Sequence, residues 1–84
     1  MTTLPIEERI VHMIAQLTPV RPAEIQMQHR LREDLGLDSV CSMELLSMLA
    51  EQMDLDVPIE EAMGITTVGE AVAMARRHLA ARGA

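Results

Sequence analysis

The stretch "EDLGLDSVCSMELLSMLAEQM", residues 33–53, carries the clearest structural signal in the chain. Wound as a helix at about 100° per residue, residues 39–53 bring one apolar face together: Leu45, Leu46, Leu49 and Met53. Asp38 and Ser39 precede this face, and both are residue types that cap helix N-termini. We therefore expect a helix that begins at Asp38 or Ser39, ends near Met53 and turns its leucine face to the core.

Two more helices are predicted towards the ends of the chain. From Pro5, apolar residues recur at helical spacing, and the helix should end before Thr18-Pro19, because a residue that precedes proline avoids the helical conformation. Thr67 and Glu70 fit the Thr-x-x-Glu pattern of a capping box. This pattern predicts a last helix that continues to about Arg82 and has one apolar face: Val68, Val72, Ala75 and Leu79.

A long connection and a short helix are expected between these elements. Proline and glycine interrupt residues 18–38, and five apolar residues can hold this segment to the core: Ile25, Met27, Leu31, Leu35 and Leu37. A connection of about twenty residues is long for a compact domain, which indicates a functional loop or a hidden helical turn. Asp56 is expected to cap the short segment "PIEEAM", residues 58–63, which ends at Gly64.

Three main helices and one short helix in 84 residues predict an all-α fold, a small four-helix bundle around one core. Hydrophobic residues make up 49% of the chain, but none of them is Phe, Tyr or Trp. The core must therefore consist of aliphatic residues and methionine. We expect residues 1–84 to form a single domain.

The acidic charge is concentrated in the middle of the sequence. The net charge is −6, and residues 24–61 alone carry ten acidic residues and two arginines. A nucleic acid is not expected as a partner, because phosphate contacts need a basic surface. An acidic surface favours fast encounters with basic partner proteins, although it would equally serve to keep the protein in solution.

The sequence shows no sign of a disulfide, a membrane segment, an export signal or a metal site. Cys41 is the only cysteine, which excludes an internal disulfide. No stretch approaches the length of a membrane span, and residues 1–10 lack the pattern of a secretory signal, so we expect a cytoplasmic protein without membrane contact. His12, His29 and His78 lack the close spacing of a metal site, so we assign no metal ligand.

The outer face of the helix expected at residues 39–53 has the composition of a small docking surface. This docking face consists of Val40 and, at its margin, Met43, together with the polar residues Glu44, Ser47 and Glu51. An apolar contact inside a charged rim is common in protein interfaces. Singly exposed apolar residues are also common, however, so the pattern alone leaves both interpretations open.

Ser39 also admits two interpretations. It can be an ordinary helix cap, as most serines in such a position are. Alternatively, its hydroxyl can carry a phosphodiester, because a helix N-terminus presents unpaired N–H groups and a partial positive charge. Leu35 and Leu37 would anchor the preceding loop to the core, and Gly36 would let it turn tightly.

The run from Asp34 to Val40, "DLGLDSV", resembles the signature of the acyl carrier proteins, Asp-Leu-Gly-x-Asp-Ser followed by an apolar residue. Residues 43–58, "MELLSMLAEQMDLDVP", are similar to the second helix of that family and the turn after it. Residues 65–72, "ITTVGEAV", resemble the start of its last helix. The resemblance covers residues 5–80 and implies the four-helix bundle of acyl-carrier type.

The resemblance also implies a cofactor, 4′-phosphopantetheine, attached covalently to Ser39 through a phosphodiester. A phosphopantetheinyl transferase would transfer it from coenzyme A with the help of a divalent metal ion. The arm ends in a thiol that holds acyl groups as thioesters for partner enzymes. Asp38 matches the acidic residue that helps the transferase and its metal engage. We expect Leu37, the residue before it, to belong to the attachment site as well.

The partners implied by the resemblance are acyl-loading, synthase, transferase and tailoring enzymes with basic docking patches. Val40, Met43 and Glu44 match positions that such partners contact, and we add Ser47 and Glu51 from the same face. The chain itself is expected to be a monomer and not an enzyme. No Gly-x-Ser-x-Gly pattern surrounds the serine, and 84 residues leave little room for the substrate pocket of a small esterase.

The docking face departs from the commonest fatty-acid carrier pattern. Only Glu44 and Glu51 are acidic within the second helix, and Cys41 and Ser42 stand where acidic residues or threonine are frequent. We therefore expect a carrier for a dedicated polyketide or mixed polyketide–peptide pathway. Met1 and the absence of linker sequence favour a free-standing protein. The alternatives are a housekeeping fatty-acid carrier, an aminoacyl or peptidyl carrier, and an unmodified acidic interaction module.

Overall fold

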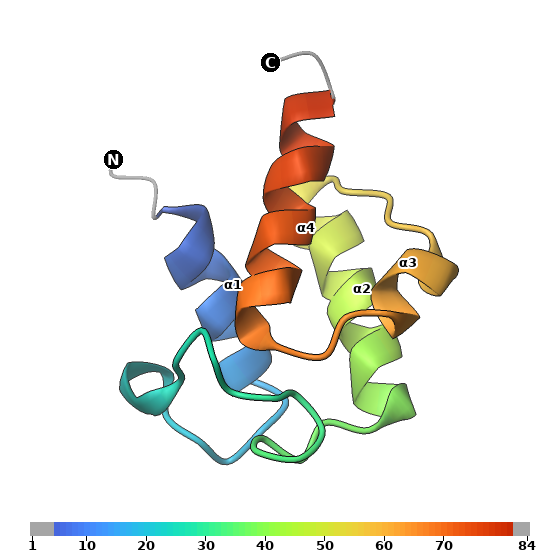
Figure 1. The fold of residues 1–84 in the computed structure, drawn as a ribbon. Helices are drawn as coiled ribbons and strands as arrows, with labels where there is room; N and C mark the ends of the chain where they lie inside the picture. Colours follow the sequence, from blue (N-terminus) through green and yellow to red (C-terminus); the bar gives the residue numbers. More distant parts are fainter. Residues whose placement is uncertain (1–4, 82–84) are drawn as a thin grey trace.

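The computed structural model describes residues 5–81, which fold into helices joined by loops (Figure 1). The elements in chain order are α1 (Ile6–Ala15), the 3₁₀ turn η1 (Pro22–Glu24), α2 (Ser39–Met53), α3 (Ile59–Met63) and α4 (Val68–Ala81). The expected all-α fold, with three main helices and one short helix, is confirmed. Within the part of the chain that the structure describes, no helix is long and apolar enough to cross a bilayer.

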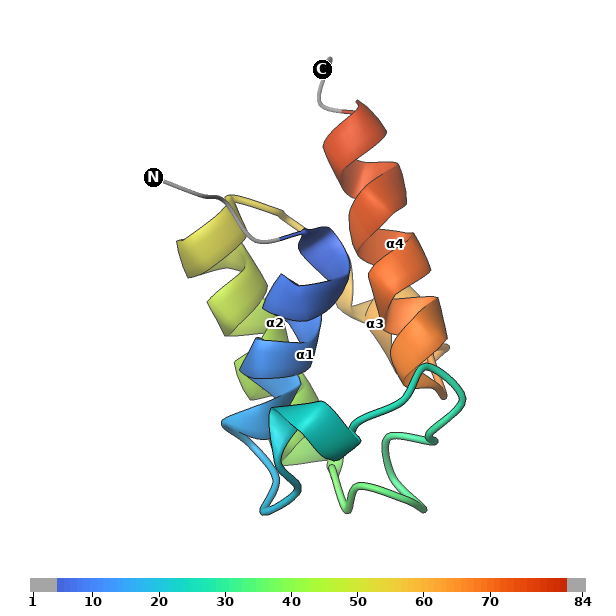
Figure 2. The same ribbon diagram turned by 90° about the vertical axis from the view of Figure 1, so that its left-hand side faces the viewer.

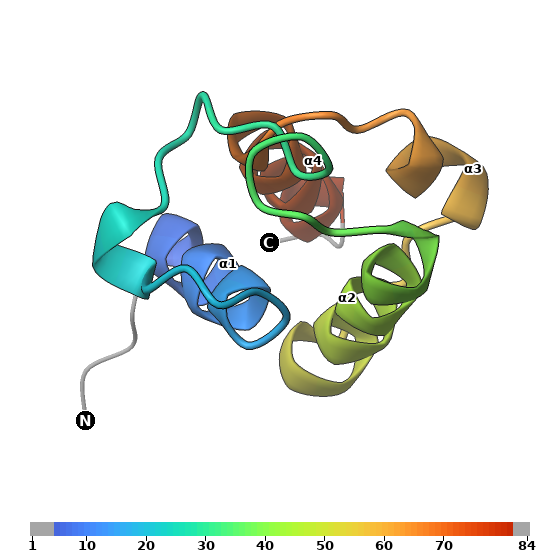
Figure 3. The ribbon, with the colours of Figure 1, turned by 90° about the horizontal axis from the view of Figure 1, so that it is seen from below.

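The core lies between α1, α2 and α4. α1 packs against both of the other long helices, and α3 packs against α2 (Figure 3). α1 runs in the opposite direction to α2 and α4, so α2 and α4 begin at the same end of the bundle (Figures 1 and 2). The largest of the fully buried side chains are aliphatic or methionine: Ile10, Met13, Ile14, Leu49, Leu55 and Val68.

α2 turns its leucine face inward, as the sequence predicts. Leu45, Leu49 and Met53 are buried, whereas Leu46 lies at the edge of the core and is half-buried. The helix bounds also agree with the expected start and end. The docking face lies on the other side of α2 and is exposed to solvent.

The long connection between α1 and α2 crosses the end of the bundle at which α2 and α4 begin, and it is bound to the start of α4. The Leu31 N–H donates to the carbonyl of Thr66 at 2.8 Å, and the Gly69 N–H donates to the carbonyl of Met27 at 2.8 Å. Glycine permits the second approach, because a Cβ on Gly69 would lie 3.2 Å from the Met27 carbonyl oxygen. The connection contains η1, which is the hidden helical turn. Of its expected anchors, Met27 is half-buried and the others are buried: Ile25, Leu31, Leu35 and Leu37.

α4 begins with the predicted capping box. The Glu70 N–H donates to Thr67 Oγ1 at 3.1 Å, and the Thr67 N–H donates to Glu70 Oε1 at 3.3 Å. The same carboxylate oxygen accepts the Thr66 N–H at 2.7 Å. These bonds, the Thr66 backbone bond first, hold the pKa of Glu70 below its ordinary value. The expected end of this helix near Arg82 lies outside the described residues.

The predicted cap of the short helix is wrong. Pro58 occupies the N-cap position of α3 with an extended backbone, φ −60° and ψ 139°, and no side chain caps the first turn. Asp56 therefore lies two residues before the cap position, where its carboxylate does not serve the helix. α3 is instead joined to α4 through Glu61, whose carboxylate contacts His78 Nε2 at 2.9 Å and the Arg77 guanidinium at 3.0 Å.

Candidate functional site

The start of α2 places Ser39 at the surface. Asp38 is the N-cap residue, with an extended backbone, and Ser39 is the first residue of the helix and is exposed. Leu37, just before them, is buried in the core. Gly36 has a φ of +74°, a left-handed conformation that glycine adopts at little cost. A glycine turn and a buried leucine thus lead directly to an exposed hydroxyl.

The helix cap is supplied by Asp38, and Ser39 is not the capping residue. The Cys41 N–H donates to Asp38 Oδ1 at 3.0 Å. This hydrogen bond holds the pKa of Asp38 below its ordinary value, so the carboxylate is ionised at neutral pH. The Ser39 hydroxyl makes no hydrogen bond to any residue that the structure describes. Its position at the helix N-terminus is therefore not explained by capping.

A tight turn precedes the glycine and is closed by Asp34. The Arg30 N–H donates to Asp34 Oδ2 at 2.7 Å, and the Arg30 guanidinium lies 3.6 Å from the same oxygen. The backbone bond, followed by the charge of Arg30, lowers the pKa of Asp34. The Gly36 N–H then donates to the carbonyl of Arg32 at 3.1 Å. These bonds fix the backbone that carries the Arg32 side chain.

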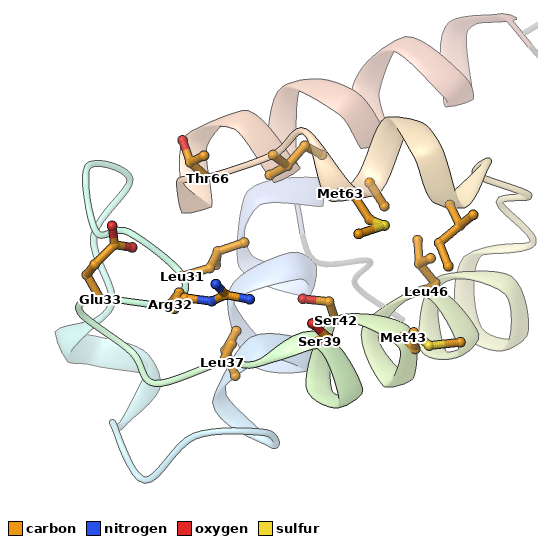
Figure 4. A pocket seen from close by; sticks show the side chains of 13 residues that line it. Leu31, Arg32, Glu33, Leu37, Ser39, Ser42, Met43, Leu46, Met63 and Thr66 are labelled. Carbon is orange, nitrogen blue, oxygen red and sulfur yellow. The ribbon is translucent and has the colours of Figure 1, made fainter.

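A pocket of about 380 Å³ opens beside Ser39, between the long connection, α2, α3 and the loop that follows α3 (Figure 4). Ser39, Ser42 and Arg32 line one end, and Figure 4 shows the Arg32 guanidinium pointing toward the two serines. Apolar side chains form most of the wall on the side of α3: Leu46, Ile59, Ala62, Met63 and Ile65. The pocket suits an elongated group that is charged or polar at the serine end and less polar at the other.

The five residues of the docking face are all exposed along α2. Val40 and Met43 are 65% and 55% exposed, and the polar members are exposed as well: Glu44, Ser47 and Glu51. Met43 also lines the pocket, which joins the docking face to it. The docking role of these residues stays a prediction, and their common exposure on the helix that Ser39 begins is consistent with it.

Sequence reasoning missed three residues of the site. Ile59 and Met63 of α3 are 41% and 72% exposed and line the pocket opposite α2. Their spacing of four residues within "PIEEAM" places them on one side of a helix, and this signal could have identified them. Arg32 is the only basic residue between residues 31 and 75, and this isolation was the available signal for it.

The described residues also contain no cluster of metal-ligating side chains. No three His, Cys, Asp or Glu side chains gather closely enough to hold a metal ion among residues 5–81. Cys41 is half-buried on the flank of α2, in contact with the core.

Comparison with known proteins agrees with the fold. The sequence model of the family described as "Phosphopantetheine attachment site" matches residues 8–75. One similar solved structure is the solution structure of the apo doublet acyl carrier protein from prodigiosin biosynthesis, with a TM-score of 0.72 and 28% sequence identity. That match covers 86% of this chain and 35% of the other, so this chain spans about a third of the doublet protein. The chain belongs to the phosphopantetheine-attachment family and is a carrier protein of the acyl carrier type, the class of domain to which 4′-phosphopantetheine is covalently attached.

Proposed function

We propose that Ser39 is the residue to which 4′-phosphopantetheine is attached. The observation that supports this most strongly is an exposed hydroxyl at the first position of α2, at the mouth of a pocket, with the capping role taken by Asp38 instead. The serine lies inside the segment that matches the family. Attachment requires a hydroxyl that a transferase can reach, and Ser39 meets this requirement.

The residues around Ser39 fit the group chemically. α2 has 15 residues, so its N-terminus offers a partial positive charge to the phosphate. The adjacent pocket has polar residues near Ser39 and apolar residues on α3, which matches a chain that leads from a phosphate to an acyl group. When bound, the group supplies a thiol that holds acyl groups as thioesters. The role of the chain is to position that thiol and to present it to other enzymes.

Two other serines provide internal controls. Ser42 is half-buried, and Ser47 is exposed on α2 about two turns after Ser39. We would incubate the apo protein with coenzyme A, magnesium and a broadly specific phosphopantetheinyl transferase and measure the intact mass. The wild type, Ser42→Ala and Ser47→Ala should each gain one phosphopantetheine, and Ser39→Ala should gain none. Modification of a folded Ser39→Ala variant would overturn the assignment.

We also propose that the docking face receives partners with basic patches. Its two carboxylates, Glu44 and Glu51, lie on the exposed side of the helix that Ser39 begins. Glu44→Gln should slow modification by the transferase several-fold at low salt, and the difference should shrink as salt is added. Glu8→Gln removes a carboxylate that is also exposed, from α1, and serves as the matched control. Equal rates for the two variants would contradict the proposal.

The pathway we propose is a dedicated polyketide or mixed polyketide–peptide pathway. The acyl carrier protein from prodigiosin biosynthesis is 28% identical to this chain, and the docking face of this chain has few acids. Housekeeping fatty-acid elongation enzymes should therefore use the loaded protein much less efficiently than they use their own carrier. Equal efficiency would favour a fatty-acid carrier, and efficient loading by amino-acid-activating enzymes would favour an aminoacyl or peptidyl carrier.

We further propose that the chain acts as a cytoplasmic monomer and catalyses no reaction of its own. Carrier domains of this family are generally not catalytic, which supports the last point. A net charge of −6 opposes self-association at low ionic strength. Sedimentation should therefore give the mass of one chain, and incubation of esters with the apo protein should give no turnover above the Ser39→Ala background. A stable dimer, or turnover that depends on Ser39, would contradict these two points.

A further inference from the structure

Arg32 is the arginine whose guanidinium has no hydrogen bond or ion pair with any of residues 5–81. Each of the other arginines described has a partner; Arg30, for example, lies 3.8 Å from Glu33 and 3.6 Å from Asp34. Residues 24–61 carry ten acidic residues, so partners are abundant in sequence. An arginine that pairs with none of them keeps all of its donors for a ligand.

The position of Arg32 indicates which ligand it can meet. Arg32 lines the same pocket as Ser39 and Ser42, and its guanidinium points toward them (Figure 4). Glu33 also borders this pocket, but it is paired with Arg30, and its carboxylate points away from Ser39. Asp38, next to Ser39, is bound by the Cys41 N–H. Arg32 is therefore the one cationic side chain among the residues that line the pocket, and no described carboxylate is paired with it.

We propose that Arg32 binds the phosphodiester that is formed on Ser39, an inference that rests on the proposed attachment at that residue. A guanidinium presents its donors in a planar fork that matches two oxygens of a phosphate. The phosphate is the group bonded directly to Ser39 Oγ, so it stays at this end of the pocket. An anionic acyl cargo would lie at the far end of the arm. The oxyanion that Arg32 meets is therefore the phosphate.

This contact gives the arm a preferred direction. The N-terminus of α2 and the Arg32 guanidinium attract the phosphate together, one from the helix axis and one from the pocket side. The group that follows the phosphate is then directed along the pocket toward α3, rather than into solvent. Arg32 also offsets the repulsion between the phosphate and the ionised Asp38.

The test uses nuclear magnetic resonance of the ¹⁵N-labelled protein, with the Arg32 Nε–H signal as the probe. That signal is identified by its loss in Arg32→Gln. It is then compared between the apo protein and protein loaded from coenzyme A, from acetyl-coenzyme A and from malonyl-coenzyme A. Arg21→Gln is the matched control, because Arg21 is exposed, is paired with Glu24 at 3.1 Å and does not border the pocket.

Intact mass is measured first, so that failure of attachment and failure of this inference are distinguished. With Ser39 fully modified, the Arg32 Nε–H signal should shift to the same extent in all three loaded forms, and the shift should shrink as salt is added. The ³¹P signal of the arm should indicate faster local motion in Arg32→Gln than in wild type or Arg21→Gln, with partial recovery in Arg32→Lys. An unchanged Arg32 signal would overturn the inference. A shift confined to the malonyl form would also overturn it, because the cargo carboxylate would then be the ligand.

Discussion

Replacing Gly36 by alanine should destabilise the protein through its backbone alone. Gly36 has a φ of +74°, and a Cβ built there meets no atom within 4 Å. The methyl group therefore causes no collision, and the cost is that of holding an L-residue in the left-handed region, about 1–2 kcal/mol. The lower entropy of the unfolded alanine chain offsets about 0.4–1 kcal/mol of this. The expected net loss in the free energy of unfolding is about 1 kcal/mol, equivalent to a melting temperature about 4–8 °C lower.

Circular dichroism during urea and thermal unfolding would measure this loss, with three variants to isolate its cause. Gly36→Asn should lose less stability than Gly36→Ala, because asparagine tolerates the left-handed region. A chemically synthesised chain with D-alanine at position 36 should be at least as stable as the wild type, since D-residues prefer positive φ and alanine lowers the entropy of the unfolded chain. If Gly36→Ala matches the wild type, or if D-alanine costs as much as L-alanine, the reasoning from backbone chirality is refuted.

Three further substitutions test the packing, the capping and the charge interactions of the bundle. Leu49 is 1% exposed, so Leu49→Ala should lower the free energy of unfolding by about 2–5 kcal/mol in urea titrations. A loss smaller than that of Gly36→Ala would contradict the place of Leu49 in the core. Thr67→Ala should lower the free energy of unfolding by about 1 kcal/mol in the same assay with an unchanged m-value, because it removes the Oγ1 that accepts the Glu70 N–H in the first turn of α4. An unchanged free energy of unfolding would mean that the capping box contributes nothing to stability. The hydrogen bond with His78, and then that with Arg77, hold the pKa of Glu61 below its ordinary value. This stabilisation is present above the pKa of the unfolded carboxyl and is lost as the pH falls through the lower folded value, so Glu61→Gln should make the loss of stability below about pH 4 less steep. Parallel acid-unfolding profiles for Glu61→Gln and wild type would show that the link between α3 and α4 carries no such energy.

The predictions that the structure confirms rest on local signals. The start of α2 follows from a capping residue ahead of an apolar periodicity, and the start of α4 follows from a capping box whose two hydrogen bonds join residues only three positions apart. Such patterns need no knowledge of the rest of the fold. The error at Asp56 arose within the same kind of reasoning: Pro58 was assigned to the first turn of the helix, whereas its extended backbone places it at the cap.

The pocket could not be predicted from the sequence because it depends on where distant segments meet. The walls come from the long connection, from α2 and from α3, and the docking of α3 beside α2 determines its shape. The direction of the Arg32 side chain depends on the turn closed by Asp34, which spacing alone does not reveal. The sequence identifies Ser39 as the candidate attachment residue, and the structure describes the pocket beside it.

Tandem mass spectrometry of the loaded protein tests the central claim most directly. Trypsin should release residues 33–76 as one peptide that contains all three serines, so the modified residue must be located by its fragment ions. The account predicts phosphopantetheine on Ser39 in every modified molecule, with fragments that contain only Ser42 and Ser47 at their unmodified mass. Phosphopantetheine on either of those two serines, or none after complete reaction of a folded protein, would contradict it.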